Sequence, residues 1–125
     1  MQKRYLLGID YLIDVVKGKY KTTIICQLGK SRQHYGQLLR NVSKENGVPV
    51  TKKVLTSQLK SLMDAGIVQR RVLETMPPQT EYSLTDRGAE IRALMVQLSI
   101  AGEELVEETA TPVEITYTSR CIDQS

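Results

Sequence analysis

In the middle of the chain a helix, two short strands and a longer helix are predicted in one uninterrupted succession, which limits the fold more than any other feature. Thr51 stands where a helix N-cap belongs, and Gly66 supplies a left-handed C-terminal cap. The β-branched stretch 67–73, the proline-rich turn 76–79 and the segment 81–84 then predict a hairpin. The helix between the two caps carries its leucines on one face, at Leu55, Leu59 and Leu62.

Three further amphipathic helices are predicted before this succession. Apolar residues recur at helical spacing over residues 5–16 and again over 19–28. Ser31 is placed to cap a third helix, and the turn-forming residues of 43–49 end it. The apolar face of this third helix consists of Tyr35, Leu38, Leu39 and Val42. A helix-turn-helix followed by a hairpin and a long helix is the order of a winged helix, so we expect an α+β, mostly α, winged helix-turn-helix fold.

The final helix, which Thr85 is placed to cap, has apolar residues alternately three and four positions apart, at Ile91, Leu94, Leu98, Ala101 and Leu105. This spacing forms the seam of a coiled coil, which needs a partner helix. The helical pattern is lost after residue 108, so we expect one domain over 1–108 and a flexible tail over 109–125. An edge strand is the other possibility in the tail, on the alternating residues Val113, Ile115 and Tyr117.

Charge is divided unevenly along the chain, although the net charge of the whole is only +3. Residues 1–71 carry 14 Lys and Arg against 4 Asp and Glu, whereas residues 72–125 carry 3 against 10. The first part therefore has a balance of +10 and the second −7. Such asymmetry favours a polyanion as partner of the basic part, and a solvated basic face without a partner is the alternative.

The predicted helix 51–64 places cations and hydroxyls opposite its leucines, and no Asp or Glu occurs between Thr51 and Ser61. Such a face fits the major groove of DNA, where Lys contacts phosphates or guanine and Thr or Ser contacts bases or phosphates. The hairpin 67–84 would then act as a wing on the backbone or minor groove. The candidate DNA-binding residues are Thr51, Lys52, Lys53, Thr56, Ser57, Lys60, Arg70, Arg71 and Gln79. A polar face is ordinary for a surface helix, so a winged-helix protein–protein interaction module without DNA binding remains the alternative.

Several classes of function are disfavoured by what the sequence lacks. His34 is the single histidine, so the usual hydrolytic triads have no set of residues to use. Cys26 and Cys121 stand far apart without metal-ligand spacing, and no phosphate-binding glycine loop occurs. We therefore expect no enzymatic activity, catalytic residue, metal or cofactor. No signal peptide or membrane span is predicted, and this favours a cytoplasmic protein without a membrane partner.

With these segments in view, the chain resembles the HxlR-type winged-helix transcriptional regulators of bacteria. The most specific match is PPQTEYSLTDRG at residues 77–88, which is similar to the family pattern PPxVEYSLTxxG. KVLTSQLKSLMDAGIVQR at 53–70 resembles the family's recognition helix and first wing strand, and GKY at 18–20 resembles its GKW. Together the matches cover about residues 7–105.

The resemblance implies a DNA-binding homodimer whose first and last helices flank the winged helix and form the dimer interface. Two recognition helices would then meet successive major grooves of a pseudo-palindromic operator. The dimer-interface residues that it implies are Leu6, Ile9, Ile13, Ile91, Leu94, Leu98, Ala101 and Leu105.

The chain departs from the family pattern at several positions. Leu7 stands where many members have a sensor cysteine, and His34-Tyr35 replaces Arg-Phe. The segment between Tyr35 and Val50 is about five residues longer than usual, and Ala101 replaces a tryptophan. Control by a small-molecule effector of unknown identity, bound between the long helices and the DNA-binding core, is a further hypothesis, motivated only by the helical seam.

Overall fold

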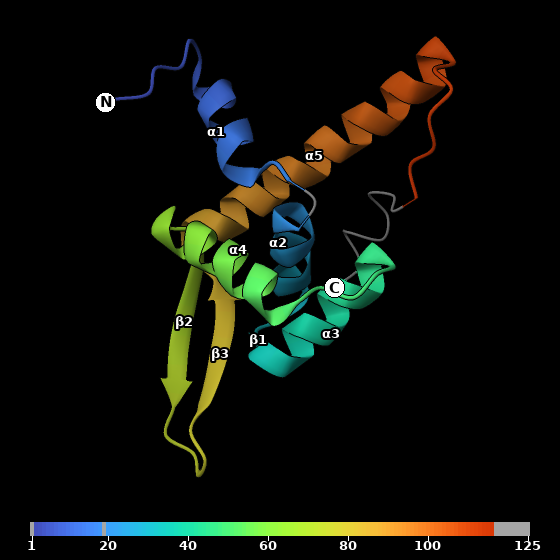
Figure 1. Cartoon of the computed structure of the whole chain (residues 1–125). Helices are drawn as coiled ribbons and strands as arrows, with labels where there is room; N and C mark the ends of the chain where they lie inside the picture. The colour runs from blue at the N-terminus through green and yellow to red at the C-terminus, as the bar shows by residue number, and fades with distance from the viewer. Residues whose placement is uncertain (1, 19, 117–125) are drawn as a thin grey trace.

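A computed structural model describes residues 2–18 and 20–116 of the chain. Helices predominate, and three short strands form one antiparallel sheet in the order β1-β3-β2, which confirms the expected fold class. Two helices diverge at one end of the molecule, and the β2–β3 hairpin projects from the other (Figure 1). The elements are α1 (Gly8–Val16), α2 (Lys21–Lys30), β1 (Gln33–His34), α3 (Tyr35–Asn46), α4 (Lys52–Asp64), β2 (Val68–Leu73), β3 (Gln79–Leu84) and α5 (Asp86–Thr109).

The short strand β1 is a feature that the sequence did not predict. It pairs with β3 in the register Gln33↔Tyr82, so the chain before α3 is extended. The Gln33 side chain is buried, and its Nε2 donates to the main-chain oxygen of Gln27 at 2.9 Å. Because of these contacts, α3 begins only at residue 35. The prediction that Ser31 caps this helix is therefore wrong, because His34 is the N-cap and Ser31 ends α2.

The core lies where α2, α3 and α4 meet one face of the sheet. The leucine face of α4 enters it as predicted, and Leu55 is 0% exposed. Thr51 caps α4, since its Oγ1 accepts a hydrogen bond from the Val54 amide at 3.2 Å. Gly66 follows the helix at φ 77°, a left-handed conformation that glycine adopts without steric cost. The buried cluster consists of Ile24, Ile25, Leu28, Leu38, Val42, Val50, Leu55, Leu59, Leu62, Ile67, Val68 and Tyr82.

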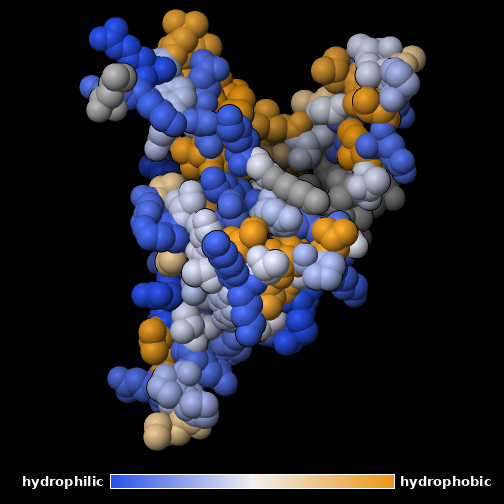
Figure 2. Space-filling model, in the orientation of Figure 1, coloured by the Kyte–Doolittle hydropathy of each residue, from blue (hydrophilic) through white to orange (hydrophobic). Residues whose placement is uncertain are grey.

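Helices α1 and α5 leave this core and diverge as two arms, between which the molecule is hollowed (Figures 1 and 2). No residue of α1 is buried, and in α5 only Gly88 and Val96 are. The helix α5 continues to Thr109 and carries the chain away from the sheet (Figure 1). Residues 111–116 accordingly form no strand, so the edge-strand possibility is wrong for Val113 and Ile115, and Tyr117 lies outside the described residues. None of the helices described here has the length and hydropathy needed to cross a bilayer.

Candidate nucleic-acid interface

The outward face of α4 carries the cations and hydroxyls that the helical periodicity predicted. Because the leucines at every third or fourth position are drawn into the core, the positions between them are left at the surface. Lys60 is paired with Asp64 through a 3.1 Å contact between Nζ and Oδ2, where both side chains are well exposed. The exposed candidate residues of the helix and its cap are Thr51, Lys52, Lys53, Thr56, Ser57 and Lys60.

Tyr35 at the start of α3 fixes the N-terminal turn of α4. Its hydroxyl donates to the main-chain oxygen of Lys52 at 3.0 Å and lies 3.0 Å from Oγ1 of Thr56. The Tyr35 ring also packs against Tyr82 of β3, with the ring centroids 6.4 Å apart. The end of α4 that would enter a groove first is therefore tied to both α3 and the sheet. The sequence placed Tyr35 on the apolar face of its helix but did not reveal this positioning role.

On the hairpin, Arg70, Arg71 and Gln79 are exposed, as expected for a wing. Arg71 lies directly opposite Glu81 in the β2–β3 register, and its Nη2 is 3.4 Å from Oε1 of that carboxylate. Nη1 of Arg32, just before β1, is 3.7 Å from the same oxygen. The sequence did not single out Arg32 or Glu81, because their proximity depends on the unpredicted pairing of β1 with β3.

The junction between α4 and the hairpin is tightly built, so the helix and the wing hold a fixed relation. Thr85 caps α5 by accepting from the Gly88 amide at 3.0 Å, and its hydroxyl donates to the Gly66 oxygen at 2.6 Å. A Cβ at Gly88 would lie 2.1 Å from the main-chain oxygen of Ile67, so only glycine allows this approach. The first turn of α5 is thereby fastened to the segment that joins α4 to β2.

The residues considered for other chemistry occupy structural positions. His34 is the N-cap of α3, and its main-chain amide donates to Oε1 of Gln37 at 3.1 Å. Cys26 is buried against Val96 of α5, and this burial, helped by the negative charge of Glu45, raises the pKa of its thiol to about 11. No three His, Cys, Asp or Glu side chains gather as a metal site within residues 2–18 and 20–116. Cys121 lies outside the described residues.

The arms expose the residues that the family resemblance assigned to a dimer interface. Leu6 is 91% exposed, and side chains on both arms remain about half exposed, a degree unusual for large apolar residues. Figure 2 shows hydrophobic side chains gathered on these arms, opposite the hairpin. Ile91 differs, because it packs against the core of its own chain. The exposed members of the set are Leu6, Ile9, Ile13, Leu94, Leu98, Ala101 and Leu105, and the arms also expose Leu7 and Tyr11.

A helix-turn-helix whose second helix presents a cationic face beside an arginine-bearing hairpin defines the winged helix-turn-helix class. The model of the HxlR-like helix-turn-helix family matches residues 15–110, and the chain belongs to this family. It is thus a transcriptional regulator with a winged-helix fold, in a family of DNA-binding regulators.

The individual proteins to which the chain is similar are also regulators. The HTH-type transcriptional regulator YtcD of Bacillus subtilis is 29% identical over 101 residues, which span 81% of this chain and 76% of YtcD. A MarR-family transcriptional regulator from Enterococcus faecalis superposes with a TM-score of 0.75 at 25% identity, over 88% of this chain and 96% of the other. The redox regulator HypR in its oxidised form superposes with a TM-score of 0.66 at 28% identity, over 78% and 96% of the two chains.

Proposed function

We propose that this chain binds duplex DNA as a homodimer, with α4 in the major groove and the β2–β3 wing on the backbone or minor groove of a pseudo-palindromic operator. The observation that carries the proposal is the outward face of α4, where cations and hydroxyls stand without any acidic residue until Asp64. Surface helices ordinarily mix charges of both signs, and a one-signed face suits a polyanion. The adjoining wing adds Arg70 and Arg71 to the same basic surface.

The candidate residues divide by chemistry into two groups. Thr56 and Ser57, near the first turns of α4, suit base edges, and Lys53 suits either guanine or a phosphate. The remaining cations and Gln79 suit phosphates, which fix the position of the protein on the duplex. Thr51 also has a structural role, since its hydroxyl caps α4. We assign no catalytic role, cofactor or metal to this surface.

A second copy of the chain is the proposed partner of the exposed arms. The leucines of α5 keep the alternating spacing of a helix seam, and Leu94 and Leu98 remain 54% and 53% exposed in one chain. Burying them against another copy would remove apolar surface from water, which is the main driving force of association. In a symmetric dimer the two α4 helices would then be presented together to successive grooves.

The test is salt-dependent binding to a duplex from the intergenic DNA beside the gene. Lys53→Ala should weaken binding and lower the slope of log K against log salt by about two units, because the homodimer loses one cationic contact in each half-site. Lys17→Ala is the matched control, since Lys17 is similarly exposed but ends α1 on the opposite side from the wing (Figure 1). Absence of any salt-dependent binding by the wild type would contradict the proposal. It would favour a winged-helix protein–protein interaction module, which a pull-down enriched for one acidic protein would support.

A small-molecule effector is proposed for the cavity between α2 and α5, which has a volume of about 560 Å³. This size is within the range of ligand pockets, and the lining joins apolar side chains to a few hydrogen-bonding groups. Its lining residues include Val16, Thr22, Thr23, Asn46, Met95 and Ser99.

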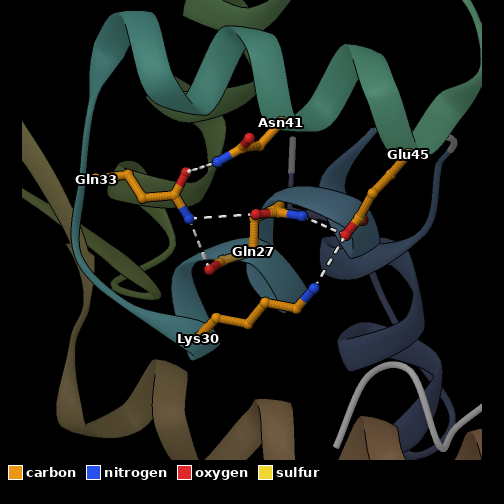
Figure 3. A network of polar contacts seen from close by, with 5 residues as sticks. All are labelled: Gln27, Lys30, Gln33, Asn41 and Glu45. Carbon is orange, nitrogen blue, oxygen red and sulfur yellow. Dashed lines mark hydrogen bonds and ion pairs between the residues drawn. The ribbon is translucent and has the colours of Figure 1, made fainter. Parts of the chain in front are cut away.

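A partly buried polar network connects this cavity to the sheet (Figure 3). Glu45 lines the cavity, accepts a hydrogen bond from Gln27, and lies 3.4 Å from Nζ of Lys30. Nε2 of Gln33 in β1 donates to Oε1 of Gln27 at 3.3 Å, and Oε1 of Gln33 accepts from Asn41 at 2.9 Å. A ligand that disturbed Glu45 would therefore act on the strand next to the wing. Unchanged DNA affinity across a panel of candidate metabolites would argue against such control.

A further inference from the structure

Two arginines from different parts of the chain share one carboxylate at the base of the wing. Nη2 of Arg71 on β2 and Nη1 of Arg32, just before β1, lie 3.4 and 3.7 Å from Oε1 of Glu81. The arginine side chains are both 65% exposed, whereas that of Glu81 is 14% exposed. The acidic group is therefore set into the surface, and the two cations lie on its outer side.

This geometry leaves most of the donors of both arginines open to solvent. A guanidinium has five N–H donors in a fixed planar fork, so one contact with Glu81 uses a small part of its capacity. Holding the fork with a carboxylate also restricts a side chain that otherwise has many rotamers. The entropy that binding a second anion would cost is thereby reduced.

The position of the pair relates it to the proposed DNA surface. Arg32 stands three residues before Tyr35, whose hydroxyl bonds to the N-terminal turn of α4. Arg71 belongs to the wing, and β3 lies between the two arginine-bearing segments in the sheet. Because the neighbouring Tyr82 points into the core, Glu81 lies on the opposite face of the sheet. The pair therefore extends the basic surface of the wing on that face.

We propose that Arg32 and Arg71, positioned by Glu81, form a binding site for one backbone phosphate of DNA at the base of the wing, on the face of the sheet turned away from the core. This inference rests on the proposed DNA-binding function, and it adds Arg32 as a contact residue and Glu81 as a positioning residue. The chemistry recognised is a phosphodiester, whose oxygens match the donor fork of a guanidinium.

The sign of the effect of Glu81 separates this site from a simple basic patch. If only net charge mattered, Glu81→Gln would strengthen binding to DNA, because a negative charge would leave the surface. If Glu81 holds the two arginines in place, the same substitution weakens binding, because both side chains lose their anchor. If the ion pair only holds β1 against the hairpin, the substitution would lower thermal stability and leave the salt slope of DNA binding unaltered.

The experiment measures the affinity of the full chain for the intergenic duplex over a series of salt concentrations, with circular dichroism to confirm folding. Arg32→Gln should reduce the salt slope by about 1.8 and the affinity by roughly 25- to 100-fold at 0.1 M salt, because the homodimer loses one phosphate contact in each half-site. Arg32→Lys should keep the slope but lose affinity, since an ammonium lacks the fork that reaches Glu81 and a phosphate together. Glu81→Gln should weaken binding about two- to threefold. Lys17→Gln, another exposed and ion-paired cation, is the control and should change neither quantity.

Three results would overturn the inference or its basis, and they differ from one another. A wild-type slope and affinity in folded Arg32→Gln would remove Arg32 from the interface, even if Lys53→Ala still weakened binding. Tighter binding by Glu81→Gln would overturn the positioning role. Absence of DNA binding by the wild type would instead reject the proposed function itself, before any of these variants was compared.

Discussion

The winged-helix half of this molecule and its two arms use apolar residues in opposite ways. In the first, Leu38, Leu55 and Leu62 are 0% exposed and lie within one continuous core. In the arms, no residue of α1 is fully buried, and Leu98 of α5 stays 53% exposed. A helix with half its apolar side chains in water gains less stability from its own chain, because helix formation alone contributes little without packing. The difference shows that the winged-helix half has a complete core in one copy, and it supports the proposal that the arms pack against a second copy.

The largest expected effect tests the completed half. Leu55→Ala should lower the free energy of unfolding by about 2–5 kcal/mol, because it removes a fully buried side chain and leaves a cavity among packed neighbours. Urea unfolding followed by circular dichroism measures this change. Leu98→Ala is the matched control from the arm and should cost much less at concentrations where the protein is a monomer. Equal losses in the two variants would show that the arm is packed as tightly as the core.

The second effect concerns the arms. Leu98→Glu should weaken dimerisation by about 3 kcal/mol or more, roughly a hundredfold in the dimer Kd, because each dimer loses two leucines from the proposed seam. Sedimentation equilibrium over a range of concentrations gives this constant. The helical content of the winged-helix half should be unchanged, since Leu98 lies outside the buried cluster. A wild-type chain that sediments as a monomer at every concentration would remove the need for a second copy.

Alanine substitutions at two glycines of α5 should change stability by smaller amounts and in opposite directions. Gly88→Ala should destabilise the fold by about 1–3 kcal/mol, because the new Cβ would lie 2.1 Å from the Ile67 oxygen. At Gly102 nothing lies within 4 Å of such a Cβ, so Gly102→Ala should stabilise the helix by about 0.5–1 kcal/mol. Thermal unfolding of both variants provides the comparison. If Gly102→Ala instead weakens the dimer, the second copy approaches the helix closely at that point.

The sequence predicted those parts of the fold and candidate site that depend on local chemistry. Thr51 and Thr85 cap their helices in the structure, and Gly66 follows α4 in the left-handed conformation, because a hydroxyl or a missing Cβ acts on the nearest turn. The leucine face of α4 follows from helical periodicity alone, and it places the candidate DNA-binding residues on the opposite side.

The sequence did not predict the features that depend on pairing between distant segments of the chain. The strand β1 has two residues, too few for any alternation to show, and it exists because Gln33 meets Tyr82 on β3. The same pairing replaced the predicted Ser31 cap with His34 and brought Arg32 to Glu81. A contact between two residues 49 positions apart produces no pattern from which a single sequence could predict it.

A pH-dependent effect arises where the two regions meet, at Cys26. The pKa of its thiol is raised from 9.0 to about 11, first by burial and then by Glu45, so the folded state keeps the proton to a higher pH than the unfolded state does. The contribution of this group to stability is therefore full below pH 9.0 and is lost as pH rises through about 11. Other groups also titrate in this window, so the readout is a difference between two proteins. The wild type should lose more unfolding free energy than Cys26→Ala between these pH values, while Cys121 is present in both. If α5 opens readily from α2, Cys26 is solvated, the two pH profiles coincide, and the arm is less firmly attached to the core than its buried Val96 indicates.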